Sequence, residues 1–162
     1  MFPSAPVTFE IANARSDDAV RAMQAYFDEL AERFPEGFDP GDTLTADAHT
    51  FDPPHGAFVL VRSRMETVGC GGVHRLDERC GEIKRMWVSS KVRGQGIGRA
   101  LLDNLEEHCS RLGYDTVRLD TNSVLTQAIR MYESSGYVSI PAYNDNPFAK
   151  RWFEKSLSEQ LS

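Results

Sequence analysis

The sequence predicts a mixed α/β fold (α+β) in which helices pack against one mixed sheet, and two patterns lead to this prediction. Three strand-like runs follow one another at 57–62, 67–76 and 81–89, and their short connections SRME and DERC indicate an antiparallel meander. Helix-like and strand-like runs then alternate toward the C-terminus. Because an amphipathic helix must bury its apolar face, we expect these helices to cover the sheet.

The N-terminal part of the chain is predicted to hold one outer strand and one long helix. Residues 7–14 (VTFEIANA) alternate between apolar and polar side chains, as an edge strand does. Ser16 precedes two aspartates and is a suitable N-cap, so we expect a helix from there to about Phe34, where a proline and a glycine follow. Residues 35–56 are expected to form a loop with one short helix near 42–48.

The elements after the meander are predicted from apolar periodicity and from the glycines at their ends. Gly113 and Gly136 each follow a helix-like run, and glycine is the common residue just after a helix. The expected order is helix 96–112, strand 116–121, helix 125–135, strand 137–140 and strand 148–157.

Length and composition indicate one globular domain over residues 1–162. Apolar residues make up 41% of the chain and charged residues 26%, which are ordinary values for a folded protein. No apolar run approaches the roughly 20 residues that span a bilayer. The N-terminal MFPSAPVTFE has neither the basic start nor the apolar segment of a secretory signal. We therefore expect a cytoplasmic protein with no membrane partner.

Charge and cysteine content exclude two further classes of function. The formal net charge of −6 argues against a nucleic-acid partner, because phosphate contacts need a basic surface. The same charge is compatible with a cationic acceptor such as an amine. Cys70, Cys80 and Cys109 are odd in number and form no CxxC pair, so we expect reduced thiols and no metal site.

The segment RGQGIGRALL (93–102) places three glycines between two arginines where a helix is expected to begin. The N-terminus of a helix leaves N–H groups unpaired, and glycine lets a phosphate approach them closely. A Walker loop needs a Lys-Ser/Thr pair, which does not follow these glycines. A dinucleotide fingerprint needs GxGxxG after a first strand, not GxGxG after a meander. The remaining alternative is a tight strand-to-helix turn without a ligand.

Two motifs of the sequence resemble the GNAT superfamily, the acyl-CoA-dependent N-acyltransferases, and the closing stretch PAYNDNPFAKRWFEKSL (141–157) resembles the tail of its small bacterial-type members. The family's pyrophosphate loop, Arg/Gln-x-x-Gly-x-Gly/Ala, is matched by Arg93, Gly96 and Gly98, although Ser90 stands where proline is common. The family's second signature, A-x-x-x-Y-x-x-x-G-[FY], is matched by AIRMYESSGY (128–137). The resemblance implies a GNAT-like fold, with a central, mostly antiparallel sheet, a splayed parallel strand pair and flanking helices.

The resemblance also implies acetyl-CoA as the acyl donor, with no metal. Backbone N–H groups of the glycine loop would cradle the pyrophosphate, and the strand that precedes the loop would pair with the pantetheine arm. Asn122 is placed near this arm or at the cap of the following helix. The expected cofactor-binding residues are Met86, Trp87, Val88, Arg93, Gly94, Gln95, Gly96, Ile97, Gly98, Arg99 and Asn122.

Two catalytic residues are implied for the attack of a primary amine on the thioester. Glu82 is the expected general base, since many family members carry a glutamate on the matching strand; Tyr132 is the expected general acid for the departing thiolate. The alternative for Tyr132 is a core position, because it shares one apolar helix face with Leu125. The alternative for Glu82 is a structural ion pair with Arg62, Arg64 or Arg85. The other candidate bases are Cys80, His74 and Asp120.

The acceptor is predicted only as a primary amine of a small molecule or a peptide, and the acyl chain beyond acetyl is left open. By their place in the implied fold, its candidate contacts are Tyr26, Phe27, Arg33, Phe34, Tyr143, Asn144 and Asn146. The alternative function is a non-catalytic acyl-CoA-binding sensor or interaction module, which would keep the loop and dispense with Glu82 and Tyr132. A homodimer is common for the implied fold.

Overall fold

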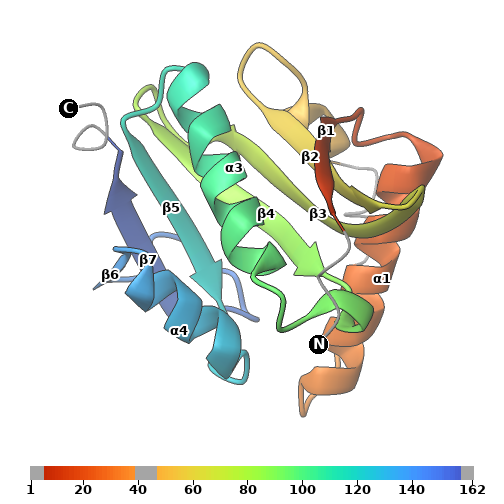
Figure 1. Cartoon of the computed structure of the whole chain (residues 1–162). Helices are drawn as coiled ribbons and strands as arrows, with labels where there is room; N and C mark the ends of the chain where they lie inside the picture. Colours follow the sequence, from red (N-terminus) through yellow and green to blue (C-terminus); the bar gives the residue numbers. More distant parts are fainter. Residues whose placement is uncertain (1–5, 39–46, 158–162) are drawn as a thin grey trace.

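The computed structural model describes residues 6–38 and 47–157 (Figure 1). Two short 3₁₀ turns, η1 and η2, accompany the helices and strands. The elements in chain order are β1 (Thr8–Ile11), α1 (Asp17–Arg33), η1 (Ala48–Phe51), β2 (Ala57–Ser63), β3 (Glu66–Arg75), β4 (Cys80–Val88), η2 (Ser90–Val92), α3 (Ile97–Arg111), β5 (Thr116–Thr121), α4 (Thr126–Ser134), β6 (Val138–Ile140) and β7 (Arg151–Ser156).

The seven strands form one mixed sheet in the order β1-β2-β3-β4-β5-β7-β6. The predicted meander is confirmed, because β2 pairs antiparallel with β3, and β3 pairs antiparallel with β4. β7 lies between β5 and β6 and runs antiparallel to both. Within the described residues, β4 and β5 are the one parallel pair. The predicted fold class, a mostly antiparallel sheet with one parallel pair and flanking helices, is therefore confirmed.

The N-terminal elements follow their local signals. Ser16 caps α1 through its side chain, which accepts a hydrogen bond from the N–H of Ala19. β1 lies at the edge of the sheet as predicted, although it is shorter than the alternating run. The predicted helix near 42–48 falls almost wholly outside the described residues, and η1 begins at Ala48. Across residues 6–38 and 47–157, no helix is both long and apolar enough to cross a bilayer.

The central strands are buried on both faces because helices cover both sides of the sheet. On β2, Phe58 and Leu60 pack in the cluster beside α1, whereas Val59 and Val61 pack in the cluster beside α3. In Figure 1, α3 crosses the front of the sheet and α1 lies beyond β3. This two-sided burial explains why AFVLV reads as a continuous apolar run in the sequence.

The parallel pair separates after a short stretch, and this separation opens the sheet at its centre. β4 pairs with β5 only from Cys80 to Glu82, although both strands continue beyond that point. A register shift between β3 and β4 marks the same region, because Cys70 pairs with Trp87 but Gly72 pairs with Lys84. β4 therefore carries one extra residue there, which is a β-bulge, and leaves its backbone edge open toward β5.

Candidate functional site

The glycine loop forms the N-terminal end of α3. Gly94 has φ +80° and Gly96, the N-cap of α3, has φ +79°. Glycine is required there because this left-handed conformation is unfavourable for residues with a Cβ atom. A Cβ atom added at either glycine would meet nothing within 4 Å. No side chain caps the first N–H groups of α3, so they are available to an anion, as at anion sites on helix N-termini.

A cavity of about 340 Å³ lies beside this loop. Its walls come from the end of β4, the loop itself, the first turn of α3, and helices α1 and α4. Most of the predicted cofactor-binding residues line it together: Met86, Trp87, Val88, Arg93, Gly94, Gly96, Ile97, Gly98 and Arg99. Gln95 is exposed and lies outside this lining, as does Asn122.

The two arginines of the loop differ in how firmly they are held. Arg93 donates from Nε to the carbonyl oxygen of Val88 at 3.0 Å, and its Nη2 forms an ion pair with Glu29 on α1. These contacts fix the loop against both β4 and α1. Arg99 is exposed at the rim of the cavity, where its charge can supplement the helix N-terminus.

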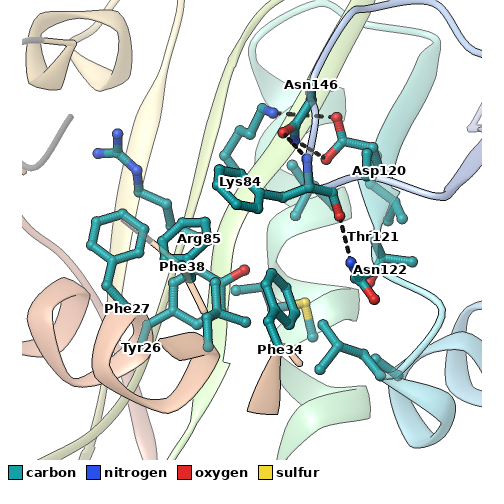
Figure 2. Close-up of a pocket in the computed structure, with 18 of the residues that line it drawn as sticks. Tyr26, Phe27, Phe34, Phe38, Lys84, Arg85, Asp120, Thr121, Asn122 and Asn146 are labelled. Carbon is teal, nitrogen blue, oxygen red and sulfur yellow. Dashed lines mark hydrogen bonds and ion pairs between the residues drawn. The ribbon is translucent and has the colours of Figure 1, made fainter. Parts of the chain in front are cut away.

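A second cavity, of about 420 Å³, lies on the α1 face of the sheet (Figure 2). Aromatic side chains form much of its wall, and Phe148 packs against Phe38 with ring centroids 4.6 Å apart. The linings of the two cavities have six residues in common: Tyr26, Leu30, Met86, Leu125, Ala128 and Tyr132. The two cavities therefore meet where β4 and β5 separate, so a molecule in each would be in contact there.

Tyr132 occupies this junction. Its side chain is largely buried, and its ring packs against Tyr137 and Phe153. Among the described residues, its hydroxyl has no hydrogen-bond partner. Burial, together with the charge of Asp120, raises the pKa of Tyr132 to about 12. The phenol is therefore protonated at neutral pH, and Tyr132 lines both cavities.

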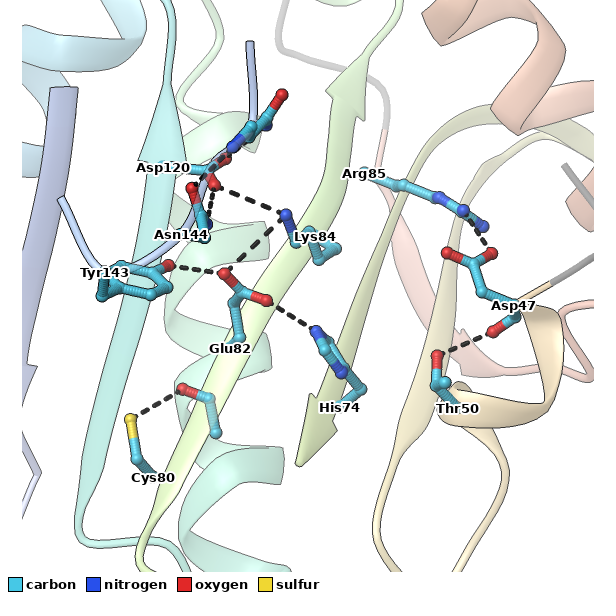
Figure 3. A network of polar contacts seen from close by, with 12 residues as sticks. Asp47, Thr50, His74, Cys80, Glu82, Lys84, Arg85, Asp120, Tyr143 and Asn144 are labelled. Atoms are coloured by element: carbon cyan, nitrogen blue, oxygen red, sulfur yellow. Dashed lines mark hydrogen bonds and ion pairs between the residues drawn. The ribbon is translucent and has the colours of Figure 1, made fainter. Parts of the chain in front are cut away.

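Glu82 is the centre of a buried polar network (Figure 3). Its Oε1 lies 2.7 Å from Nε2 of His74, its Oε2 accepts a hydrogen bond from Tyr143 at 2.5 Å, and Nζ of Lys84 lies 3.7 Å away. Burial alone raises the pKa of Glu82, but the hydrogen bond from His74, the charge of Lys84 and the hydrogen bond from Tyr143 outweigh it and hold the pKa below its usual value. Glu82 is thus ionised in the folded protein.

Glu82 does not line the larger cavity. Its partner His74 does. The arginine partners considered from the sequence were wrong. Arg62 pairs with Glu10 and Asp18, and Arg85 pairs with Asp47. The real partners come from the opposite position on β3 and from the loop before β7.

Replacing Glu82 with glutamine is expected to lower stability at neutral pH by about 2 kcal/mol, because hydrogen bonds to a buried charge are lost. The folded pKa of Glu82 lies below the unfolded value near 4.5, so its contribution is complete above that pH and is lost as the pH falls through the folded pKa. Thermal unfolding between pH 3 and 7 should therefore show the two proteins converging in acid. The exposed Glu133→Gln is the control, and a difference that stays constant down to pH 3 would contradict the assignment.

Asp120 lines the larger cavity, and its side chain is 8% exposed. Its Oδ2 accepts a hydrogen bond from Asn144 at 2.6 Å and lies 3.5 Å from Nζ of Lys84. Asn146 reaches Oδ1 at 3.5 Å. The loop before β7 therefore closes over the end of β5 through contacts to this carboxylate.

The predicted acceptor contacts divide into three groups. Tyr26, Phe27, Phe34 and Asn146 line the larger cavity. Tyr143 and Asn144 lie behind it, on Glu82 and Asp120. Arg33 instead lines the smaller cavity and pairs with Glu29 at 3.6 Å.

Asn122 takes a structural position. Its Oδ1 accepts a hydrogen bond from the N–H of Val124, and its Nδ2 donates to the carbonyl oxygen of Phe148. The first contact is the expected turn, but the expected cap role was wrong, because the N-cap of α4 is Leu125 and no side chain caps that helix. The second ties the end of β5 to the loop before β7, so Asn122 lines the larger cavity instead of the one beside the glycine loop.

Lys84 and Arg85 also line the larger cavity, although no pattern in the sequence assigns them to a site. On a regular strand, neighbouring side chains point to opposite faces, so only one of the two was expected on this side. The bulge in β4 brings both to the same face. A register shift of this kind depends on two strands at once and leaves no local signal in the sequence.

Two further sequence expectations concern thiols and metals. The three cysteines are buried free thiols. Burial raises the pKa of Cys80 to about 12, which makes this thiol a poor candidate for the base. Within the described ranges, no three His, Cys, Asp or Glu side chains come together as a metal site.

Comparison with known proteins identifies the family of this chain. The Acetyltransferase (GNAT) family profile matches residues 23–137. An uncharacterized N-acetyltransferase of Schizosaccharomyces pombe is 33% identical over 108 residues, which are 65% of this chain and 66% of that protein, so the match spans just under two thirds of that relative.

Solved structures resemble the chain over nearly its whole length. A putative acyl-CoA N-acyltransferase from Klebsiella pneumoniae has a TM-score of 0.76 and 27% identity, over 93% of this chain and 97% of that one. A GNAT family acetyltransferase from Elizabethkingia anophelis, solved with acetyl-CoA bound, has a TM-score of 0.69 and 19% identity, over 93% and 98% of the two chains. At the latter identity the likeness shows the fold.

Proposed function

The chain belongs to the GNAT acetyltransferase family, and from that premise we propose that it transfers an acetyl group from acetyl-CoA to a primary amine. The observation that carries this proposal is the meeting of two cavities at Tyr132, one beside the glycine loop and one lined by aromatic side chains. A donor and an acceptor in these cavities would approach each other at the opening between β4 and β5.

The residues of the smaller cavity fit an extended thioester. The open edge of β4 beyond Glu82 offers backbone N–H and C=O groups to the amides of a pantetheine arm. The helix N-terminus at Gly96 and the side chain of Arg99 would bind the pyrophosphate at the other end. Bound in this way, acetyl-CoA would place its thioester at the junction and supply the acetyl group.

In the proposed reaction the amine nitrogen forms a bond to the thioester carbonyl carbon, and the carbon–sulfur bond breaks. The departing thiolate takes a proton, and Tyr132 is the proposed donor because its high pKa keeps it protonated. The amine loses a proton in the same reaction. Since an amine is mostly protonated at neutral pH, an acceptor group is needed.

Glu82 is proposed to take part in this proton transfer through His74. His74 lines the acceptor cavity, and its Nε2 lies 2.7 Å from the ionised carboxylate of Glu82. A buried carboxylate behind an imidazole orients the ring and stabilises the charge that a proton brings to it, as in catalytic triads. In this arrangement His74 would contact the amine or a bridging water. Glu82 would not touch the amine itself, but would orient the ring of His74 and stabilise its charge.

Incubating the protein with acetyl-CoA and a panel of primary amines, while free thiol is followed, tests the proposal. We expect thiol release that depends on the amine, with an N-acetylated product detected by mass spectrometry and little release in the control without amine. Binding of CoA without amine-dependent release across the panel would instead favour a non-catalytic acyl-CoA-binding module.

A further inference from the structure

We propose that Arg85 binds a carboxylate of the acceptor, so that the substrate is an amine whose carboxylate lies at the far end of an apolar body. This inference rests on the proposed acetyl transfer for the identity of the reacting group, and it adds the chemical class of the acceptor. Arg85 has a strained backbone conformation, its side chain is buried, and it lines the larger cavity.

The backbone of β4 is distorted in a way that directs Arg85 into this cavity. Glu82 and Lys84 point to the α1 face of the sheet, and Ile83 packs on the α3 face. Regular alternation would place the side chain of residue 85 on the α3 face as well. The bulge instead gives Arg85 φ +57°, a conformation that side chains with a Cβ atom rarely adopt. Such strain is found most often at functional sites.

The side chain of Arg85 is buried in an aromatic environment at one side of the cavity. It is 7% exposed, and its guanidinium carbon lies 5.7 Å from the centroid of the Phe27 ring and 5.2 Å from that of Phe51. The flat faces of these rings favour a cation and hold the guanidinium in place. A guanidinium held in this way presents a planar fork of donors that matches a carboxylate.

Among the described residues, Arg85 contacts Sδ of Met23 through Nη1 at 3.2 Å and forms an ion pair with Asp47, whose side chain is half-exposed and can move aside. Nη2 of Arg85 lies 2.5 Å from Oδ1 of Asp47, whose side chain is 47% exposed and lines the cavity together with Arg85. A substrate carboxylate can take over this position or share the guanidinium, while Asp47 moves into water. The Asp47 carboxylate thus marks where an anionic group is stable beside Arg85.

The opposite side of the cavity carries the carboxylate of Asp120, which lies 3.5 Å from Nζ of Lys84. Asp120 and Arg85 have no partner in common among their described contacts, and Figure 2 shows them on different sides of the aromatic side chains. Asp120 lines the larger cavity together with Tyr26 and Tyr132, which also line the smaller one. The amine of the acceptor would lie beside Asp120 and share its carboxylate with Lys84, and an apolar body fits the aromatic wall between Arg85 and Asp120. A cavity of about 420 Å³ is within the usual size range for a small-molecule ligand.

The inference is tested by direct binding, which needs no turnover. Protein saturated with CoA is titrated in a calorimeter with 4-(aminomethyl)benzoate and with the uncharged isostere 4-(aminomethyl)benzamide. We expect the benzoate to bind at least about tenfold more tightly than the benzamide, as hydrogen bonds to a charged partner imply. Arg85→Met should abolish this preference, and Asp47→Asn should strengthen it, because the competing carboxylate is gone.

A purely structural role for Arg85 predicts a different result. Both substitutions would then lower the melting temperature, and neither would change the ratio of the two affinities. Equal binding of the two probes by the unmodified protein, or an unchanged ratio in Asp47→Asn, would overturn the proposal even if Arg85→Met does not fold. Because binding is measured with CoA, a protein that prefers the benzoate but acetylates no amine would contradict the proposed function and still support this inference.

Discussion

Replacing Tyr132 with phenylalanine is expected to lower kcat by about ten- to a hundredfold, at the lower end of what acid catalysis contributes, because a thiolate with a pKa near 8.5 also leaves without help. The Michaelis constant for acetyl-CoA should change by less than about twofold, since only the hydroxyl is removed. The ring keeps its contacts with Tyr137 and Phe153, whose centroids lie 5.8 and 6.0 Å away, so the fold should be retained.

The pH dependence gives this prediction a second readout. Because burial and the charge of Asp120 raise the pKa of Tyr132 to about 12, the acid stays protonated well above neutral pH. We therefore expect no fall in kcat from loss of this proton up to about pH 11. A fall near pH 10, present in the unmodified enzyme and absent from Tyr132→Phe, would show that the phenol titrates normally.

Tyr137→Phe is the matched control for Tyr132→Phe. Its ring neighbours that of Tyr132, but its hydroxyl donates to Oε2 of Glu106 at 2.9 Å, outside the lining of both cavities. This control should lose the stability of one hydrogen bond to the buried Glu106, which keeps its ion pair with Lys155, and should keep its kcat. Full turnover by Tyr132→Phe, or an equal loss in both variants, would contradict the assignment of Tyr132 as the acid.

Replacing Gly96 with alanine is expected to weaken acetyl-CoA binding by about tenfold or more, because the backbone N–H groups at the start of α3 lose their arrangement around the anion. Gly96 has φ +79°, and its missing Cβ would point into open space beside the smaller cavity. The methyl group would therefore strain the loop and occupy the approach of the phosphate. Affinity can be measured by calorimetry with CoA, without any amine.

Gly113, at the C-terminal end of α3, provides a matched control for Gly96→Ala. Gly113 follows α3, has φ +98°, and also has nothing within 4 Å of an added Cβ. Gly113→Ala should therefore lose a similar amount of stability, about 1 kcal/mol, through the same left-handed strain. It should leave CoA affinity unchanged, because Gly113 lines neither cavity. Equal losses of affinity in the two variants would show that the effect of Gly96→Ala is one of folding alone.

The sequence by itself determined the donor side of this protein. The meander, the helix that begins at Ser16 and the glycine loop at 94–98 all depend on residues close together in the chain. Caps, turns and left-handed glycines act over a few residues, so their patterns can be read directly. The two family motifs are also local, and they place Tyr132 on the helix that the structure brings to the junction of the cavities.

Only the tertiary structure decided the acceptor side. Glu82 could be proposed from its strand, but its partners come from the facing strand and from Tyr143, which lies 61 positions further along the chain. The proposed site at Arg85 depends on a bulge, which forms because β4 places one residue more than β3 in the stretch where the two strands pair. A single strand does not specify how many residues its neighbour will place opposite it. The direction of Arg85, and with it the inferred preference for a carboxylate, therefore follows from the packed sheet.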